Sequence, residues 1–569
     1  MDGNLVRVDM RSLIVRYEAL SEPYQRLGGR ALTSQIIAHE VPPTCDPLGP
    51  HNKLVIAPGL LAGTVASGTG RLSIGAKSPL TGGIKESNAG GTVAEGLARL
   101  GVRGMVVEGV PQPGASGGGL FVLEVGPSGA KLVHAPDLRG LSTYAAAERL
   151  FAMYGPKVDF IVIGPAGEMK LAASGIAVSD PGGSPSRFAA RGGLGAVMGS
   201  KGLKAVVVDR GSLSRPSVAD NKAYKEAIDR YTKAILDAPQ TEVYRRLGTA
   251  GTIEVTNTLG GLPTRSFTTG RFAMAGLIAG PRMCDLILER GGKLPHRCMP
   301  GCVIRCAKEF PCKDGSAVSL EYETLCLLGS NCEIGDLDTI AALNRLCNEY
   351  GLDTIDVGGA VGIAMQAGLI EFGHGDAAVD LVKEVGKGSP LGRLIGSGGV
   401  VVGKVLGIPN VPAVKGQFMA AYEPRAIKGL GVTYATSPMG ADHTAGNTLR
   451  MPIDHGLANG QVEASRSAQI DAAVYDTLGV CLFVGPGLKG SLDLLVALVN
   501  ARYGWNWVDD DLRALGKAIL RAEIAFNRRA GIPECEDDLP EFFRGNPNPA
   551  TNTVFDVPKE ELSQVLTNI

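Results

Sequence analysis

The chain has 569 residues, more than one hydrophobic core accommodates, so we expect two or three domains. It is 44% apolar and 20% charged with a net charge of −1, which indicates neither a nucleic-acid-binding nor a membrane-binding surface. No apolar run reaches the roughly 18 residues of a membrane span, and no basic and apolar leader opens the chain.

Residues 1–210 are predicted to be rich in β-strands, because short runs of alternating or β-branched residues are separated by Gly and Pro turns. These runs are LVRVDM (5–10), SLIVRYEAL (12–20), KLVIA (53–57), RLSIGA (71–76), GMVVEG (104–109), GLFVLEV (119–125), DFIVIG (159–164) and GLKAVVVD (202–209). A polar stretch at 211–222 indicates a linker.

From about residue 222, apolar residues recur at three and four positions, as in amphipathic helices. The helical runs are 222–238, 285–291, 338–351, 358–373, 377–388, 466–479, 491–504 and 510–531. The predicted fold class is α+β, with a β-rich domain at 1–210 and mainly helical domains at 211–409 and 410–569. We expect the polar tail, 545–569, to lie on the surface.

Glycine is unusually frequent, with 79 residues, roughly twice the usual share of about 7%. The segment GTGRLSIGAKSPLTGGIKESNAGG (68–91) places Arg71, Lys77 and Asn88 among turns whose free N–H groups can bind phosphate. SRFAARGGLGAVMGSK (186–201) has the same character. Neither matches a P-loop or a dinucleotide-binding fingerprint, and ordinary β-turn chemistry is the alternative.

Two predicted helices end in related sequences, NEYGLD (348–353) and DTLGVC (476–481). Gly351 and Gly479 fit helix C-cap positions, and the residue two further on is Asp353 or Cys481. Two similar ends predict a pseudo-symmetric cradle for two halves of one ligand, although cap glycines also recur by chance.

A cysteine loop lies inside the first predicted helical domain, 211–409, with Cys298, Cys302 and Cys306 at equal spacing and a Pro–Gly pair inside it. Three soft ligands suit zinc or an iron–sulfur cluster, whereas the alternative is a set of buried apolar cysteines. The spacing differs from that of radical enzymes that use S-adenosylmethionine. The chain has 11 cysteines, and its opening residues predict no secretory leader, so we expect reduced or metal-bound thiols and a cytoplasmic location.

A zinc site and an iron–sulfur cluster both normally need a fourth ligand, and the sequence pattern alone does not identify it. The candidates are Cys312, Cys326, Cys332 and Cys481. Cys481 follows a predicted helix end, which is well placed to present it to a neighbouring element.

Taken together, these segments resemble the tungsten-containing aldehyde:ferredoxin oxidoreductase family, as a catalytic subunit, over nearly the whole chain. The resemblance rests on GRLSIGAKSPLTGGIKESNAGG, RGGLGAVMGSKGLKAV, the cysteine loop, LEYETL, NEYGLDTID, YEPRAIKGLGVTYATSPMGADH and YDTLGVCLF. It implies two molybdopterins that hold one tungsten (or molybdenum), a magnesium that joins their phosphates, and one [4Fe–4S] cluster beside one pterin.

The resemblance also implies roles for single residues. It places Cys298, Cys302, Cys306 and Cys481 on the cluster, and Arg71, Asn88, Gly90, Arg187, Asp353 and Asp476 along the pterins. Asn88 and the carbonyl of Phe188 would bind magnesium, and Glu323 and His443 would face the metal. The chain departs from the family in the cysteine spacing, in Asn348 where some members carry Asp, and in lacking a convincing Glu/His pair for a metal between subunits.

The implied reaction is oxidation of aldehydes to carboxylic acids, with electrons leaving through the cluster to ferredoxin or a small iron–sulfur subunit. We also expect an oligomer of open stoichiometry. One alternative is the catalytic subunit of a benzoyl-CoA-type aromatic thioester reductase, because Cys326 and Cys332 lie near Glu323 and a thiolate can bind tungsten. We nevertheless expect both cysteines to be core residues. The other alternative is an electron-relay subunit without a working metal.

Overall fold

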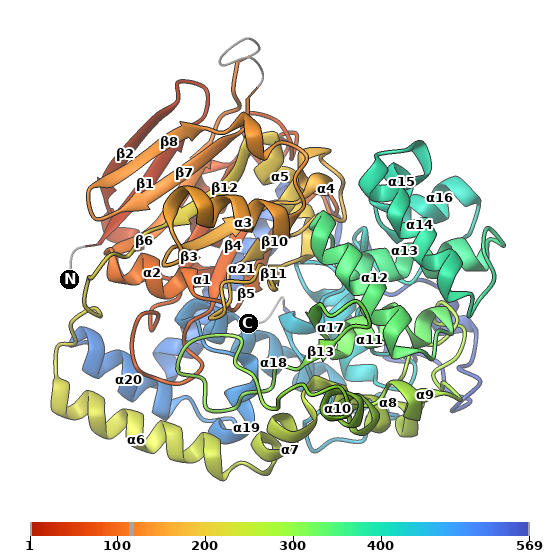
Figure 1. Cartoon of the computed structure of the whole chain (residues 1–569). Helices are drawn as coiled ribbons and strands as arrows, with labels where there is room; N and C mark the ends of the chain where they lie inside the picture. Colours follow the sequence, from red (N-terminus) through yellow and green to blue (C-terminus); the bar gives the residue numbers. More distant parts are fainter. Residues whose placement is uncertain (1–2, 113–118, 567–569) are drawn as a thin grey trace.

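The computed structural model describes residues 3–112 and 119–566. Its N-terminal part contains two six-stranded sheets, in the upper left of Figure 1. The first sheet consists of β1 (Asn4–Asp9), β2 (Ile14–Ala19), β3 (Leu54–Pro58), β4 (Leu72–Lys77), β5 (Ile84–Ala89) and β6 (Val102–Glu108), in the order β2-β1-β6-β3-β4-β5. The second consists of β7 (Phe121–Gly126), β8 (Gly129–His134), β9 (Asp159–Val162), β10 (Ile176–Val178), β11 (Arg187–Ala189) and β12 (Leu203–Val208), in the order β8-β7-β12-β9-β10-β11.

The two sheets repeat one arrangement of strands. β1 pairs with β6 and β7 with β12 in parallel, and all other neighbouring pairs in both sheets are antiparallel. Both parallel pairs shift register at their first residues. The helices repeat as well: α1 (Gly29–Glu40) and α3 (Thr143–Tyr154) follow the second strand, and α2 (Val93–Arg99) and α5 (Leu194–Ser200) follow the fifth. The N-terminal part is therefore two copies of one folding unit.

Alternate residues of the central strands serve two different cores. In β3, Leu54 and Ile56 join a core that draws side chains from both sheets, whereas Val55 and Ala57 join a core beneath α1. The same division occurs in the second copy, where α3 covers the outer face of its sheet. Central strands buried on both faces explain the continuous apolar runs in the sequence.

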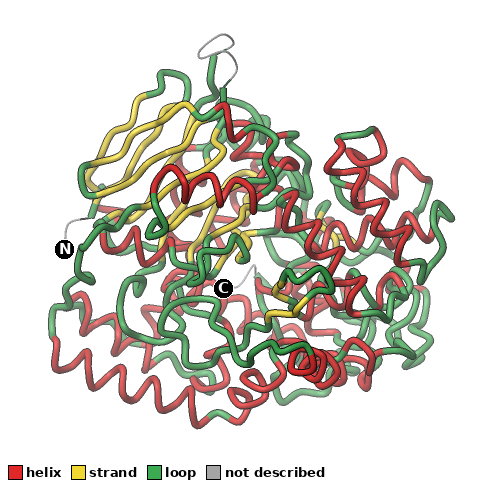
Figure 2. Tube along the Cα trace, in the orientation of Figure 1, coloured by secondary structure: helices red, strands yellow, loops and turns green. Residues whose placement is uncertain are grey.

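The chain is mainly helical from α6 onward (Figure 2). The first group of helices is α6 (Asn221–Asp237), α7 (Pro239–Leu247), α8 (Thr252–Leu259), α9 (Ala275–Ile278), α10 (Gly280–Glu289), α11 (Tyr322–Leu327), α12 (Leu337–Tyr350), α13 (Thr354–Gln366), α14 (Gly375–Lys387), α15 (Pro390–Ile395) and α16 (Gly399–Leu406). The second group is α17 (Lys428–Thr436), α18 (Gln461–Leu478), α19 (Gly485–Leu488), α20 (Asp493–Tyr503), α21 (Asp509–Arg529), α22 (Phe542–Gly545) and α23 (Lys559–Leu562). The predicted α+β class is confirmed, and the boundaries at 210 and 409 stay predictions.

The expectation that the C-terminal tail lies on the surface is only partly correct for its described part, 545–566, which has many exposed residues but is anchored by buried ones. Phe555, Val557 and Val565 are at most 1% exposed and belong to the core of the helical part. Phe555 packs directly against Gly431 of α17, where a Cβ would lie 2.5 Å from its ring. A few spaced apolar side chains therefore anchor a segment that is polar by composition.

No single helix in the described ranges is long and apolar enough to cross a membrane. The segments Gln461–Leu478 and Leu482–Leu488 reach that length and apolar character only when they are taken together, and the chain bends by 116° between them.

Candidate active site

Two helices end against the N-terminal sheets in the same way. α12 and α18 are followed by Gly351 and Gly479, whose φ angles of 74° and 75° match the predicted C-caps. A Cβ on Gly164, just after β9, would lie 2.3 Å from a backbone atom of Tyr350, and one on Gly59, just after β3, would lie 2.1 Å from the nitrogen of Gly479. Because β3 and β9 are equivalent strands, each sheet repeat holds one helix end by a close backbone contact.

Equivalent backbone hydrogen bonds fix the chain after each helix. The four N–H donors and their carbonyl acceptors are Gly175 to Gly351 (2.9 Å), Arg71 to Gly479 (3.1 Å), Asp353 to Ala173 (2.9 Å) and Cys481 to Gly68 (2.8 Å). The first two donors directly precede β10 and β4, which are again equivalent strands. The predicted pseudo-symmetry of the two helix ends is thus present in the backbone.

Each helix end carries an aspartate paired with a buried arginine. Arg191 Nε lies 3.3 Å from Asp353 Oδ2, and Arg30 Nη1 lies 3.5 Å from Asp476 Oδ2. Burial, together with Glu86, raises the pKa of Asp476 well above its usual value. The sequence reasoning missed both arginines: Arg191 lies inside a glycine-rich segment already singled out, whereas no sequence signal links position 30 to position 476.

Arg71, Asn88 and Gly90 lie together where the first sheet meets the cysteine loop. Arg71 donates to the side chain of Asn88 and, at 3.1 Å, to its carbonyl oxygen. A Cβ on Gly90 would lie 3.6 Å from Cys298 Sγ, and the N–H of Gly91 donates to the Cys298 carbonyl at 3.0 Å. The structure thus brings these predicted residues and the loop to one place.

Arg187 reaches the same region from β11 of the second sheet. Its guanidinium donates to Ser319 Oγ at 3.2 Å and to Glu321 Oε1 at 3.4 Å. Its buried Nε has no hydrogen-bond partner in the described part of the chain, so an acceptor from outside the chain fits there. Phe188, the next residue, pairs with Ala177 of β10.

The cysteine loop gathers its thiols in one cluster of side chains. Cys298, Cys302, Cys306 and Cys481 all belong to the cluster that links α6, α18 and α20, and all four are free thiols. Burial raises the pKa of Cys298 to about 12, and Arg187 opposes the rise. Thiols of this kind become thiolates when a metal replaces the proton.

Among the other candidates for a fourth ligand, Cys326 and Cys332 are fully buried in the separate core of the helical part. The Sγ of Cys332 donates to the Leu327 carbonyl at 3.3 Å. Cys312 packs against the same core. Of the four candidates, only Cys481 shares a side-chain cluster with the loop cysteines. Within the described residues, no three His, Cys, Asp or Glu side chains converge closely enough to hold a single metal ion.

Glu323 and His443 face each other from two segments far apart in sequence. Glu323 stands in the first turn of α11, and His443 opens the short 3₁₀ helix His443–Ala445. His443 Nε2 lies 3.3 Å from Glu323 Oε1, while Glu323 Oε2 accepts the N–H of Ala421 at 2.7 Å. Burial raises the pKa of Glu323, and His443 opposes the rise. His443 Nδ1 is buried without a hydrogen-bond partner in the described part of the chain.

A network of buried charges surrounds this pair. Lys85 Nζ lies 2.6 Å from Asp442 Oδ2, and Arg191 donates to the Ala441 carbonyl at 2.6 Å. Burial alone would raise the pKa of Asp442, but Lys85 and Arg191 hold it well below its usual range. Lys85 and Arg191 thus hold the two residues directly before His443 in place. Sequence reasoning missed Lys85 and Asp442, although both lie inside segments that it quoted.

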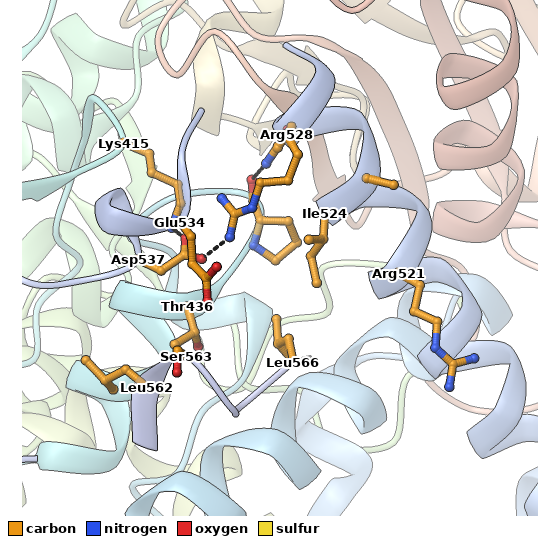
Figure 3. Close-up of a pocket in the computed structure, with 13 residues that line it drawn as sticks. Lys415, Thr436, Arg521, Ile524, Arg528, Glu534, Asp537, Leu562, Ser563 and Leu566 are labelled. Carbon is orange, nitrogen blue, oxygen red and sulfur yellow. Dashed lines mark hydrogen bonds and ion pairs between the residues drawn. The ribbon is translucent and has the colours of Figure 1, made fainter. Parts of the chain in front are cut away.

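A cavity of about 260 Å³ lies away from this pair, between α17, α21 and the C-terminal segment (Figure 3). Three of its charged lining residues pair with one another, since Lys415 Nζ lies 2.7 Å from Asp537 and Arg528 contacts the same carboxylate. It contains none of the residues predicted for the site.

Comparison with known protein families divides the chain where the N-terminal sheets end and the helical part begins. Residues 5–210 match the family profile described as "Aldehyde ferredoxin oxidoreductase, N-terminal domain", and residues 226–568 match "Aldehyde ferredoxin oxidoreductase, domains 2 & 3". The chain belongs to the aldehyde ferredoxin oxidoreductase family. It is therefore an oxidoreductase by family, and the resemblance noted from its motifs is confirmed.

Relatives cover almost the whole chain. The tungsten-containing aldehyde ferredoxin oxidoreductase of Pyrococcus horikoshii is 32% identical over 96% of this chain and 92% of that protein. The aliphatic sulfonate oxidoreductase, WOR-like subunit, of Pyrococcus furiosus is 25% identical over 95% of this chain and 89% of its own length. Among solved structures, the active site complex BamBC of benzoyl coenzyme A reductase matches with a TM-score of 0.80 at 18% identity, covering 100% of this chain and 94% of that one. At that identity, the likeness shows the fold alone.

Proposed function

We propose that this aldehyde ferredoxin oxidoreductase family member oxidises aldehydes to carboxylic acids at a tungsten (or molybdenum) centre held by two molybdopterins. The observation that carries the proposal is the Glu323–His443 pair, 3.3 Å apart and surrounded by buried charges. A carboxyl and an imidazole held together in a mostly buried site can act as a general acid–base pair. The relatives named as tungsten-containing enzymes support the same chemistry.

The two pterins would lie on the two sheet repeats, each at one helix end. Their proposed binding residues are Arg71, Asn88, Gly90, Arg187, Asp353 and Asp476. Asn88 and the carbonyl of Phe188 would bind a magnesium between the pterin phosphates. The duplication supports this arrangement, because two similar ligands fit two copies of one unit, and the unpartnered Nε of Arg187 fits an anionic group.

Cys298, Cys302, Cys306 and Cys481 would hold one [4Fe–4S] cluster beside Arg71 and Gly90. When bound, the metal centre supplies the two-electron step, and the cluster passes electrons out singly. The acceptor would be ferredoxin or a small iron–sulfur subunit. Electrons must leave the chain, because the four cysteines are the one cluster site that its sequence suggests.

The chain's own residues would orient the aldehyde and manage its protons. The overall reaction is RCHO + H₂O → RCOO⁻ + 3 H⁺ + 2 e⁻. His443 would donate a hydrogen bond to the carbonyl oxygen, and Glu323 would accept a proton from the hydrated carbon as it is oxidised. The raised pKa of Glu323 makes it a stronger base than an exposed glutamate.

The test is elemental analysis of anaerobically purified protein, combined with aldehyde-dependent reduction of benzyl viologen. About four irons and one tungsten or molybdenum per chain, with viologen reduction, are expected. Iron without tungsten or molybdenum, and no turnover, would instead indicate an electron-relay subunit. Zinc alone would overturn the cluster assignment.

The thioester reductase alternative makes a different prediction. Cys326 lies one turn after Glu323 on α11, but it is fully buried and its thiol pKa is raised well above the usual value by burial. Cys326 packs inside the apolar core of the helical part, apart from the cluster that contains the loop cysteines, which supports a structural role for it and therefore aldehyde oxidation. Reduction of an aromatic thioester without aldehyde oxidation would reverse that choice.

A further inference from the structure

Lys308 is a buried cation two residues after Cys306, one of the proposed cluster ligands. The residue is only 1% exposed. Its Nζ donates to four backbone carbonyls, those of Cys306 (3.1 Å), Arg245 (3.2 Å), Ala307 (3.4 Å) and Tyr244 (3.5 Å). In the described part of the chain, no carboxylate lies within 4.0 Å of this nitrogen. The proposed mechanism leaves this charge unused.

The lack of a paired carboxylate sets Lys308 apart from several other buried lysines. Those pairs are Lys85 with Asp442, Lys204 with Glu168, and Lys415 with Asp537. The carboxylate of Glu321 acts on Lys308 only from a greater distance, and it already accepts hydrogen bonds from Thr249 (2.7 Å) and Arg187 (3.4 Å). A buried charge without a counterion is costly, so an anionic group from outside the chain would stabilise it. A [4Fe–4S] cluster on four thiolates is such a group.

The carboxyl end of α7 lies beside Cys306 and makes the charge of Lys308 matter more. Tyr244 and Arg245 stand in the last turn of α7, where carbonyl groups carry the negative end of the helix dipole. Negative partial charge next to the cysteine loop would oppose the addition of an electron there. Burial lowers the pKa of Lys308, whereas the neighbouring thiols and Glu321 oppose the fall. A neutral amine has only two N–H donors for the four carbonyls, so the geometry favours the ammonium form.

We propose that Lys308 raises the reduction potential of the [4Fe–4S] cluster by holding one positive charge beside Cys306. The inference rests on the proposed function, in which the two electrons of each aldehyde pass through the cluster one at a time. Each electron adds one negative charge to the cluster, and the carrier of the proposed function then removes that electron. A fixed positive charge stabilises the reduced cluster more than the oxidised one. Lys308 thus makes the cluster a better acceptor without touching substrate, so it is not a catalytic residue.

The experiment is a potentiometric titration of anaerobically purified holoenzyme, with the reduced cluster followed by electron paramagnetic resonance. Lys308→Gln keeps N–H donors but loses the charge. At a fixed potential it should lower the ratio of reduced to oxidised cluster about ten-fold, which corresponds to about 59 mV for one electron. Lys308→Arg keeps the charge and should change the ratio by less than about two-fold.

The matched control is Lys201→Gln. Lys201 is also fully buried, and its Nζ also donates to backbone carbonyls, those of Gly49 (2.9 Å) and Asn52 (2.6 Å). It directly follows α5, which lies near the top of Figure 1, whereas α7 lies near the bottom. Loss of this charge should leave the ratio of reduced to oxidised cluster within about two-fold of the unmodified enzyme, because the charge is remote from the cysteine loop.

Iron content, measured on the same samples, separates the possible failures. Equal potentials in cluster-loaded Lys308→Gln and unmodified enzyme overturn the proposal and leave the proposed function intact. If Lys308→Gln loses its iron, Lys308→Met must load the cluster and show the same ten-fold fall. Loss of iron in both neutral variants would make Lys308 only a structural link between α7 and the cysteine loop, which also overturns the proposal. An unmodified enzyme without an iron–sulfur signal would instead refute the cluster of the proposed function, and the inference with it.

Discussion

Asn88 and Phe188 occupy the same position in the two sheet repeats. Asn88 pairs with Ser73, the second residue of β4, and Phe188 pairs with Ala177, the second residue of β10. β5 and β11 also contact each other, so the two residues lie on neighbouring equivalent strands. The duplication therefore gives a structural reason why two proposed ligands of one ion would come from positions that share no sequence similarity.

The first prediction separates these two ligands. Asn88→Ala should lower bound magnesium from about one per chain to near zero, because its amide oxygen is a proposed ligand. Phe188→Ala should keep the magnesium, since only the backbone carbonyl is proposed to bind. Elemental analysis of magnesium and phosphorus measures both. Magnesium retained in Asn88→Ala, or lost equally in both variants, contradicts the assignment.

The second prediction concerns the close contacts beneath the helix ends. Gly59→Ala and Gly164→Ala should each destabilise the protein by about 3 kcal/mol, because the added Cβ would meet the backbone of α18 or α12 at 2.1 or 2.3 Å. Gly276→Ala in α9 is the control, since its Cβ would meet nothing within 4 Å. Thermal unfolding measures the difference. If Gly59→Ala unfolds at the same temperature as Gly276→Ala, the helix end is not held as described.

The third prediction concerns the cluster. Cys481→Ser should abolish the iron–sulfur absorbance and most of the iron, because it removes one of four proposed ligands. Cys535→Ser is the matched control, since Cys535 is exposed and lies outside the cysteine cluster. Full iron content in Cys481→Ser, together with loss in a Cys312→Ser variant, would move the fourth ligand to Cys312.

Local patterns in the sequence were enough to predict much of this structure. Short apolar and β-branched runs marked the central strands, helical spacing marked the long helices, and Gly351 and Gly479 marked two helix ends by their C-cap chemistry. These features depend on a few neighbouring residues. The duplication was missed because β5 and β11 share a position but no residue pattern, IKESNA against RFA.

The residues that complete the site could not be predicted for a different reason. Arg30 pairs with Asp476 and Glu523, and Lys85 pairs with Asp442, across hundreds of residues. Such partners are brought together only by tertiary packing, of α1 against α18 and α21 for Arg30 and of β5 near the segment before His443 for Lys85. Phe555 is similar, because the surface that buries it is built by α17. Long-range charge pairs and anchor residues carry no local signal in a single sequence.

The fourth prediction concerns Glu323 as the base. Glu323→Gln should lower kcat at least about hundred-fold while tungsten or molybdenum, iron and phosphorus stay unchanged, because only the proton acceptor is lost. The control is Glu254→Gln on α8, an exposed carboxylate remote from the pair. Normal turnover in Glu323→Gln would refute the role. A parallel His443→Gln variant should lose turnover with the same cofactor content.

The pH profile tests the same residue independently. Glu323 can accept a proton only when ionised, and burial raises its pKa above the ordinary glutamate value of about 4.3. Activity should therefore be present above this raised pKa and fall as the pH drops through it, so the acid limb of kcat lies above pH ~4.3. The residual activity of Glu323→Gln should lack that limb, because no carboxylate remains to titrate. An acid limb that persists unchanged in Glu323→Gln would assign it to another group and leave Glu323 as a partner that orients His443.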